Sequence, residues 1–209
     1  MKRVHCALLF AVGLAACDGV FTNPHNAAPD ATPIDGKRVF TTSQAYRGGL
    51  LGGVDGADAI CADHASQVGL TGTFKAWLSQ VGTNAADRFA HATKPYVLVG
   101  DIVVAGSWDQ LLQFDLLHAI DRDEHGAAVV AETSNGDAVW TATRIDGLAV
   151  PWEPGGTTTT NPRLDCTLWA SIDGGVGMLG FWTAKDSAWT STSTGISCTE
   201  SAHLYCFEQ

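Results

Sequence analysis

The spacing of hydrophobic residues predicts one long helix near the front of the chain, after a first strand. Residues 38–43 are β-branched and aromatic and predict that strand. The stretch 55–68 predicts a helix that begins at an N-cap aspartate, Asp55, and stops at Gly69. Its apolar face carries Ala57, Cys61, Ala65 and Val68, which recur at helical spacing.

Shorter elements follow, and most of them read as strands. Gly100 and Asp101 stand between two apolar runs, which predicts a hairpin. Residues 151–162 are rich in Pro, Gly and Thr and predict a long loop. Helices near the front with strands behind them predict the α+β class and not alternating α/β. The predicted strands are 74–78, 96–99, 102–104, 139–143, 167–170, 180–183 and 204–207, and the predicted short helices are 85–90 and 108–112.

The first 16 residues have the pattern of a secretory signal peptide. Lys2 and Arg3 precede a short apolar core, residues 7–14, which is shorter than the roughly 20 residues that cross a bilayer. Residues 14–17, Leu-Ala-Ala-Cys, resemble a bacterial lipobox, in which the cysteine becomes the lipidated N-terminus. We therefore expect lipid attachment at Cys17; the alternative is an ordinary signal peptide with an incidental cysteine.

The N-terminal pattern predicts both the domain organisation and the location. A signal peptide (1–16) precedes the lipidated cysteine and a flexible tether (17–36), and a single folded domain (37–209) follows. The predicted location is the bacterial cell envelope, at the outer membrane or cell surface, with the lipid as the membrane partner. Two or more acyl chains anchor a protein stably, whereas one chain holds it marginally.

Composition excludes two broad classes. Hydrophobic residues make up 45% of the 209 residues and charged residues 16%, which rules out wholesale disorder. The chain has 12 basic and 22 acidic residues, a formal charge of −10. Nucleic-acid binding needs clustered Lys and Arg, so no nucleic-acid partner is expected.

Four cysteines remain once Cys6 leaves with the signal peptide and Cys17 is lipidated. In an exported protein they predict two disulfides, for which three connectivities exist. We favour a nested pattern, in which an outer bridge ties the early helix to the last strand. The rival is a small hairpin staple, Cys198–Cys206. The nested pairs are Cys61–Cys206 and Cys166–Cys198.

Several short motifs, in their order and spacing, resemble a bacterial family of domains of unknown function. That family occurs in surface lipoproteins and is related to the C-type-lectin-like and endostatin fold. The resemblance covers residues 37–209. It rests on Gly52-Gly53, residues 56–61 (GADAIC), 74–79 (FKAWLS), 96–99 (YVLV), Trp140-Thr141 with Gly147, Cys166-x-x-Trp169 and 204–209 (LYCFEQ).

The resemblance implies a mixed, mostly antiparallel sheet with flanking helices and the same nested disulfides. It also implies a long loop region between Thr143 and Arg163. Calcium-dependent relatives carry an amide oxygen ligand after a Glu-Pro pair. Here Gly155 follows Glu153-Pro154, and the strand positions after Trp182 and Trp189 hold no Asn or Asp. Since calcium takes six to eight oxygen ligands, we expect no metal site there.

The candidate ligand-binding residues are Trp152 and Glu153 in the long loop. An aromatic ring beside a carboxylate suits stacking on a sugar or anchoring a protein partner. The alternative is that Trp152 packs under its own loop. Three further tryptophans lie in strand patterns and are predicted to be core: Trp77, Trp140 and Trp182.

Other candidate chemistry favours ordinary structural roles. His64 is predicted to be a packed or half-exposed side chain and not a ligand. The sequence also has two groups of acidic residues, one near the start of the long helix and one around residues 121–125. They are predicted to be helix-start or solvated carboxylates and not metal sites. No catalytic motif occurs, and paired cysteines leave no nucleophilic thiol, so we predict no catalytic residues and no cofactor. The acidic groups are Asp55, Asp58 and Asp63, and Asp121, Asp123 and Glu124 with His125.

Three functions fit these sequence features. The first is a non-enzymatic, lipid-anchored domain that binds a carbohydrate or protein ligand. The second is a structural or adhesive envelope protein without a small ligand. The third is an enzyme with an unrecognised site.

Overall fold

The computed structural model describes residues 32–131, 134–151, 163–173, 175–192 and 194–209. The chain divides into two units, 1–32 and 33–209, and every helix and strand given below belongs to the second. The predicted signal peptide, the predicted lipidation site Cys17 and most of the predicted tether lie outside the described residues. Within the described residues, no helix combines the length and the apolarity needed to span a bilayer.

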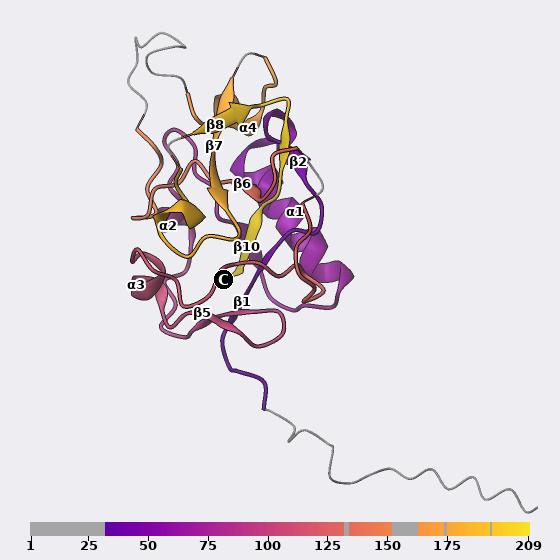
Figure 1. Cartoon of the computed structure of the whole chain (residues 1–209), viewed down its shortest axis with the longest axis vertical. Helices are drawn as coiled ribbons and strands as arrows, with labels where there is room; N and C mark the ends of the chain where they lie inside the picture. The colour runs from indigo at the N-terminus through magenta and orange to yellow at the C-terminus, as the bar shows by residue number, and fades with distance from the viewer. Residues whose placement is uncertain (1–31, 132–133, 152–162, 174, 193) are drawn as a thin grey trace, which may run out of the picture. The chain divides into compact units, whose positions relative to one another are not determined.

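Short strands and one long helix make up the second unit (Figure 1). In chain order the elements are β1 (Lys37–Thr41), β2 (Tyr46–Arg47), η1 (Gly48–Leu50), α1 (Gly53–Gln67), β3 (Phe74–Ala76), α2 (Ala85–Arg88), β4 (Tyr96–Leu98), β5 (Val103–Ala105), α3 (Trp108–Leu111), β6 (Ala138–Trp140), α4 (Cys166–Trp169), β7 (Val176–Phe181), η2 (Ser187–Trp189), β8 (Gly195–Ser197), β9 (Ser201–Ala202) and β10 (Tyr205–Glu208).

The main sheet has five strands in the order β3-β10-β1-β4-β5. β1 runs parallel to β4, and the other three pairings in this sheet are antiparallel. Phe40 of β1 lies opposite Cys206 of β10. The first and last strands are thus neighbours inside the sheet, and the predicted hairpin around Gly100 is confirmed as β4-β5.

Two smaller sheets complete the unit: β6-β7-β8 and β2-β9, both antiparallel. In β7, a Cβ built on Gly180 would stand 1.9 Å from the carbonyl oxygen of Trp189, so only glycine lets β7 approach η2 this closely. The α+β class with a mixed, mostly antiparallel arrangement is confirmed. The predicted strand 180–183 was placed too late, because β7 begins at Val176 and glycines interrupt its apolar pattern.

The long helix α1 starts earlier than its sequence pattern indicated. Its N-cap is Gly52, at φ 77°, and Asp55 lies in the first turn, so the predicted N-cap at Asp55 is wrong. The predicted stop is confirmed: Gly69 has φ 75°, and the Leu70 amide donates to the Ala65 carbonyl at 2.9 Å. This is the Schellman arrangement, in which a residue with positive φ closes the helix.

The predicted strand 167–170 is wrong. Residues 166–169 form the single turn α4, and all four have φ between 46° and 61°, in the left-handed region. The carboxylate of Asp165 accepts from the Leu168 amide at 3.2 Å, and the Trp169 amide donates to the Asp165 carbonyl. These bonds stabilise the turn. The prediction failed because a run of apolar and β-branched residues is more typical of a strand.

Both nested disulfides are confirmed. Cys61 of α1 pairs with Cys206 of β10, and Cys166 pairs with Cys198, with Cα–Cα distances of 5.3 and 5.4 Å. The rival Cys198–Cys206 pairing is therefore excluded. The outer bridge joins residues 145 apart and the inner bridge residues 32 apart.

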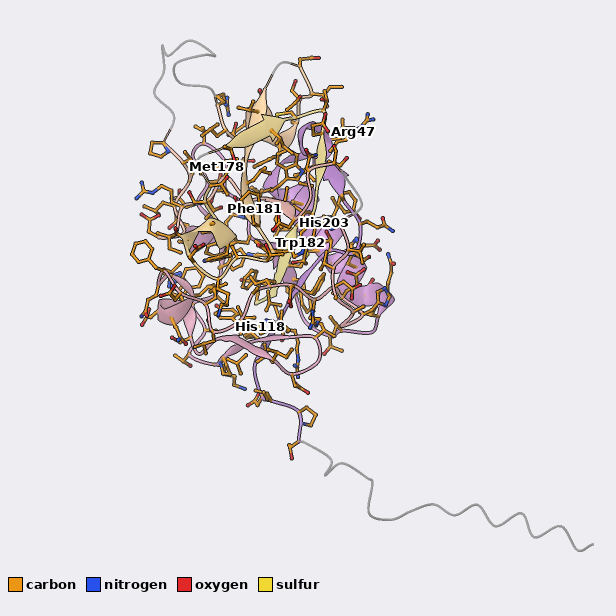
Figure 2. All side chains as sticks on the ribbon, viewed as in Figure 1. Arg47, His118, Met178, Phe181, Trp182 and His203 are labelled. Carbon is orange, nitrogen blue, oxygen red and sulfur yellow. A yellow bond between two sulfur atoms is a disulfide. The ribbon has the colours of Figure 1, made fainter. Side chains whose placement is uncertain are left out.

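The core consists of two clusters of buried residues. The cysteine cluster packs α1 against the main sheet and contains all four bridged cysteines. The aromatic cluster gathers Trp77, Phe89, Tyr96, Trp108, Trp182, Trp189, Tyr205 and Phe207, together with smaller aliphatic side chains. The predicted burial of Trp77, Trp140 and Trp182 is confirmed, and Figure 2 shows Trp182 beside His203, with ring centroids 4.8 Å apart.

Candidate functional site

The predicted ligand-binding residues Trp152 and Glu153 lie outside the described residues, so the structure shows only how their connection is attached. Before Pro151, the chain makes a tight turn in which the Arg144 amide donates to the Leu148 carbonyl at 2.8 Å. Thr143 and Ala149 form an antiparallel bridge across this turn. The first part of the predicted long loop is therefore a hydrogen-bonded turn that follows β6.

After the connection, Asp165 fixes the chain. Its carboxylate is buried and accepts from the guanidinium of Arg163 at 3.1 and 3.0 Å and from the Val81 amide at 2.9 Å. Burial alone would raise the pKa of Asp165, but the hydrogen bonds from Arg163, Val81 and Leu168 outweigh it and lower the pKa. The carboxylate is thus ionised at neutral pH, and its bond to the Val81 amide attaches the chain after the connection to the rest of the unit.

A cavity at this attachment is very small. Its volume is about 10 Å³, which is room for one water molecule. The described residues around it therefore supply a rigid floor and not a ligand-sized cleft. The lining residues are Gln80, Val81, Ala142, Ala149, Val150, Leu164 and Asp165.

A second group of polar side chains forms a hydrogen-bonded chain from Ser43 to Tyr46 through Glu124 and His64. The Nδ1 of His64 lies 2.7 Å from Oε1 of Glu124, and its Nε2 lies 2.6 Å from the Tyr46 hydroxyl. The amide of Ser43 donates to Oε2 of Glu124 at 2.9 Å, and its hydroxyl donates to Oε1. We call these four residues the Glu124 network.

The carboxylate of Glu124 sets the charge of this network. Burial would raise its pKa, but hydrogen bonds from His64 and Ser43 lower the pKa to about 2. Because an ionised carboxylate only accepts, Nδ1 of His64 carries a proton, and in the neutral ring Nε2 accepts from Tyr46. Burial, together with the charges of Glu124 and Asp63, raises the pKa of the Tyr46 phenol.

The order carboxylate, imidazole, hydroxyl is that of a catalytic triad. Access decides its role here. His64 and Glu124 are each only 3% exposed, and no residue of the network lines the small cavity beside Asp165. The network therefore joins residues 43–46, helix α1 and the turn around Glu124 as a polar clamp, whose centre, His64 and Glu124, is buried.

The network corrects one prediction and confirms another. The turn around Glu124 was expected to be solvated, yet Glu124 and Asp123 are buried. Asp123 accepts from the amides of His125 and Ala127 and closes the turn. His64 is a packed histidine, as predicted. Sequence reasoning missed its partners because 60 residues separate His64 from Glu124.

The aspartates around α1 point to separate partners. Asp58 accepts from the guanidinium of Arg88 and from the Ala76 amide, and Asp63 accepts from Gln67. Within the described part of the chain, no three His, Cys, Asp or Glu side chains gather in a way that could hold a metal ion.

No protein-family model matches this sequence, and no curated protein matches it. The family resemblance of the sequence motifs therefore stays a prediction.

Proposed function

We propose that this protein is a lipid-anchored envelope protein whose second unit is a non-enzymatic, C-type-lectin-like domain. It binds a carbohydrate or protein ligand without a calcium site, through the connection that carries Trp152 and Glu153. The anchor is the lipid on Cys17, and the location is the outer membrane or cell surface.

The observation that supports export best is the pair of nested disulfides. Disulfides persist in oxidising compartments and are rare in the reducing cytosol. Both bridges are buried and link distant segments, so they belong to the folded core and are not surface redox sites. A signal peptide ahead of such a unit is consistent with this.

Several features support the lectin-like assignment. The terminal strands β1 and β10 are adjacent, the outer disulfide ties α1 to β10, and a long connection leaves the β6–β7 sheet. Loops on a rigid scaffold are where binding residues concentrate. The ion pair of Arg163 with Asp165 supplies that scaffold at the base of the connection.

Glycan arrays and pull-downs with residues 33–209, which form a compact unit with its own core, test ligand binding. We expect a retained ligand whose binding falls at least tenfold in Trp152→Ala. The matched control is Leu148→Ala, which removes another exposed apolar side chain, 39% exposed, from the same region. Equal binding by both variants would exclude the Trp152 site. Negative arrays with altered envelope integrity in a deletion strain would favour the structural function instead.

Mass spectrometry of the purified mature N-terminus tests the anchor. We expect cleavage before Cys17 and acyl mass on that residue, and its loss in Cys17→Ser. Cys6→Ser is the matched control, because Cys6 leaves with the signal peptide and its replacement keeps the acylation. An unprocessed N-terminus in the wild type would overturn the proposal.

A further inference from the structure

A larger cavity lies between residues 91–93 and the start of α3. Its volume is about 190 Å³. None of its lining residues belongs to the 151–163 connection, and Figure 1 places α3 at the lower end of the unit, with α4 at the upper end. The lining residues are His91, Ala92, Thr93, Ser107, Trp108 and Asp109.

Two stacked rings form one wall of this cavity. His91 lies parallel to Trp108, with ring centroids 4.2 Å apart and an interplanar angle of 8°. Trp108 is only 5% exposed, and its ring also packs against Trp77 and Phe89 of the aromatic cluster. The wall is therefore held by the core and does not depend on a ligand for its position.

The backbone around the cavity is also fixed. The amide of Trp108 donates to the Ala92 carbonyl at 2.9 Å, which joins the two segments that line the site. The Ser107 hydroxyl accepts from the Gln110 amide at 3.3 Å and caps α3. A site that exists before binding spends little free energy on ordering.

The polar groups can both donate and accept. Nε2 of His91 lies 2.9 Å from the Ala86 carbonyl, which only accepts, so Nε2 carries the proton. In the neutral ring, Nδ1 is then the acceptor. The hydroxyls of Thr93 and Ser107 and the carboxylate of Asp109 complete a set suited to a ligand that bears hydroxyl groups.

We propose that this cavity is a binding site for one neutral sugar ring. Its volume lies below the roughly 300–1,000 Å³ of drug-sized ligand sites, which suits a single small ring. A sugar offers an apolar face for the aromatic wall and hydroxyls for the polar set. The formal charge of −10 and the carboxylate of Asp109 disfavour an anionic ligand. This site goes beyond the proposed binding by the connection.

The polar set also decides against a small organic cation. An aromatic cage for a cation presents open ring faces. Here the lining holds one imidazole and one indole beside two hydroxyl-bearing side chains, which is fewer ring faces than such a cage needs. Tetramethylammonium nevertheless serves as a competing probe.

Saturation-transfer NMR on the purified full chain tests the site with glucose, galactose, mannose and N-acetylglucosamine. We expect at least one sugar to bind with a Kd of about 1–10 mM, typical of a small ligand. His91→Ala and Asp109→Asn should each weaken that binding at least tenfold. Both side chains belong to exposed residues, so we expect these variants to keep the wild-type melting midpoint.

Asp115→Asn is the matched control, because Asp115 is exposed close to α3 but does not line the cavity, and it should bind as the wild type does. Loss of the sugar signal in Trp152→Ala, with the signal kept in His91→Ala, would assign the binding to the connection and overturn this site. The proposal is overturned if no sugar binds, if His91→Ala leaves binding unchanged, or if only tetramethylammonium binds. In all three cases the proposed function would remain supported if glycan-array binding is lost in Trp152→Ala.

Discussion

The two core clusters reach stability by different means. The cysteine cluster carries both crosslinks and several alanines, while the aromatic cluster has no disulfide and packs large rings edge to face. Crosslinks act mainly by restricting the unfolded chain, whereas buried rings act by removing apolar area from water in the folded state. This unit, whose strands are short, uses both crosslinks and buried rings. Substitutions in each cluster separately measure how much each contributes to the free energy of unfolding.

The largest effect is expected from removing the outer crosslink. Cys61→Ala with Cys206→Ala frees residues that lie 145 apart in sequence, and the chain-entropy relation gives a loss of about 5 kcal/mol in the free energy of unfolding. Equilibrium denaturation in guanidinium measures it. The shorter inner loop of 32 residues should cost less, about 4 kcal/mol, in Cys166→Ala with Cys198→Ala. A larger loss from the inner bridge would contradict the loop-length account.

Trp77→Ala tests the aromatic cluster. Trp77 is fully buried, contacts four other rings and donates its indole N–H to Thr190 at 2.7 Å. Truncation of such a residue costs about 3–5 kcal/mol. Denaturation midpoints measure the loss, and Phe114→Ala, at a ring that is 67% exposed, should change stability by less than about 0.5 kcal/mol. Equal losses in both variants would show that the cluster does not carry the stability of its region.

The Glu124 network predicts a loss of stability in acid. The pKa of Glu124 is about 2 in the folded protein, against an ordinary value of 4.5. Its stabilisation is therefore present above pH 4.5 and is lost as the pH falls towards 2. Glu124→Gln should cost about 1–3 kcal/mol at pH 7, because His64 loses its charged partner. Thermal unfolding from pH 7 to pH 2 should show a flatter profile in the variant; identical profiles would refute the clamp.

Asp165→Asn is expected to have the smallest effect of the four. It removes the charge that Arg163 faces, and it leaves one acceptor oxygen where the amides of Val81 and Leu168 now bond to two, so we expect a loss of about 1–2 kcal/mol. Asp146→Asn is the control, because its pairing with Arg144 is more exposed and worth less than about 1 kcal/mol. Hydrogen exchange at Leu168 should rise in the first variant only; protection unchanged there would show that the carboxylate does not hold the turn.

The elements that sequence predicted well are those specified locally. The hairpin around Gly100, the stop at Gly69 and the buried tryptophans follow from turn residues and apolar patterns close in sequence. The left-handed turn 166–169 was missed although its cap, Asp165, is the neighbouring residue, because the apolar and β-branched residues of the turn have the composition of a strand. The partners of His64 were missed for a different reason, since Ser43, Tyr46 and Glu124 meet it only in the folded chain.

The position of the last strand has a consequence for biogenesis. β10 lies between β3 and β1, so the middle of the main sheet stays open until residues 205–208 exist. Ribosomes make the N-terminus first, so a nascent chain that stops short of residue 205 lacks both the strand and the thiol of Cys206. The main sheet can therefore close only after residues 205–208 have been made. A chain truncated before residue 205 would be unable to close it.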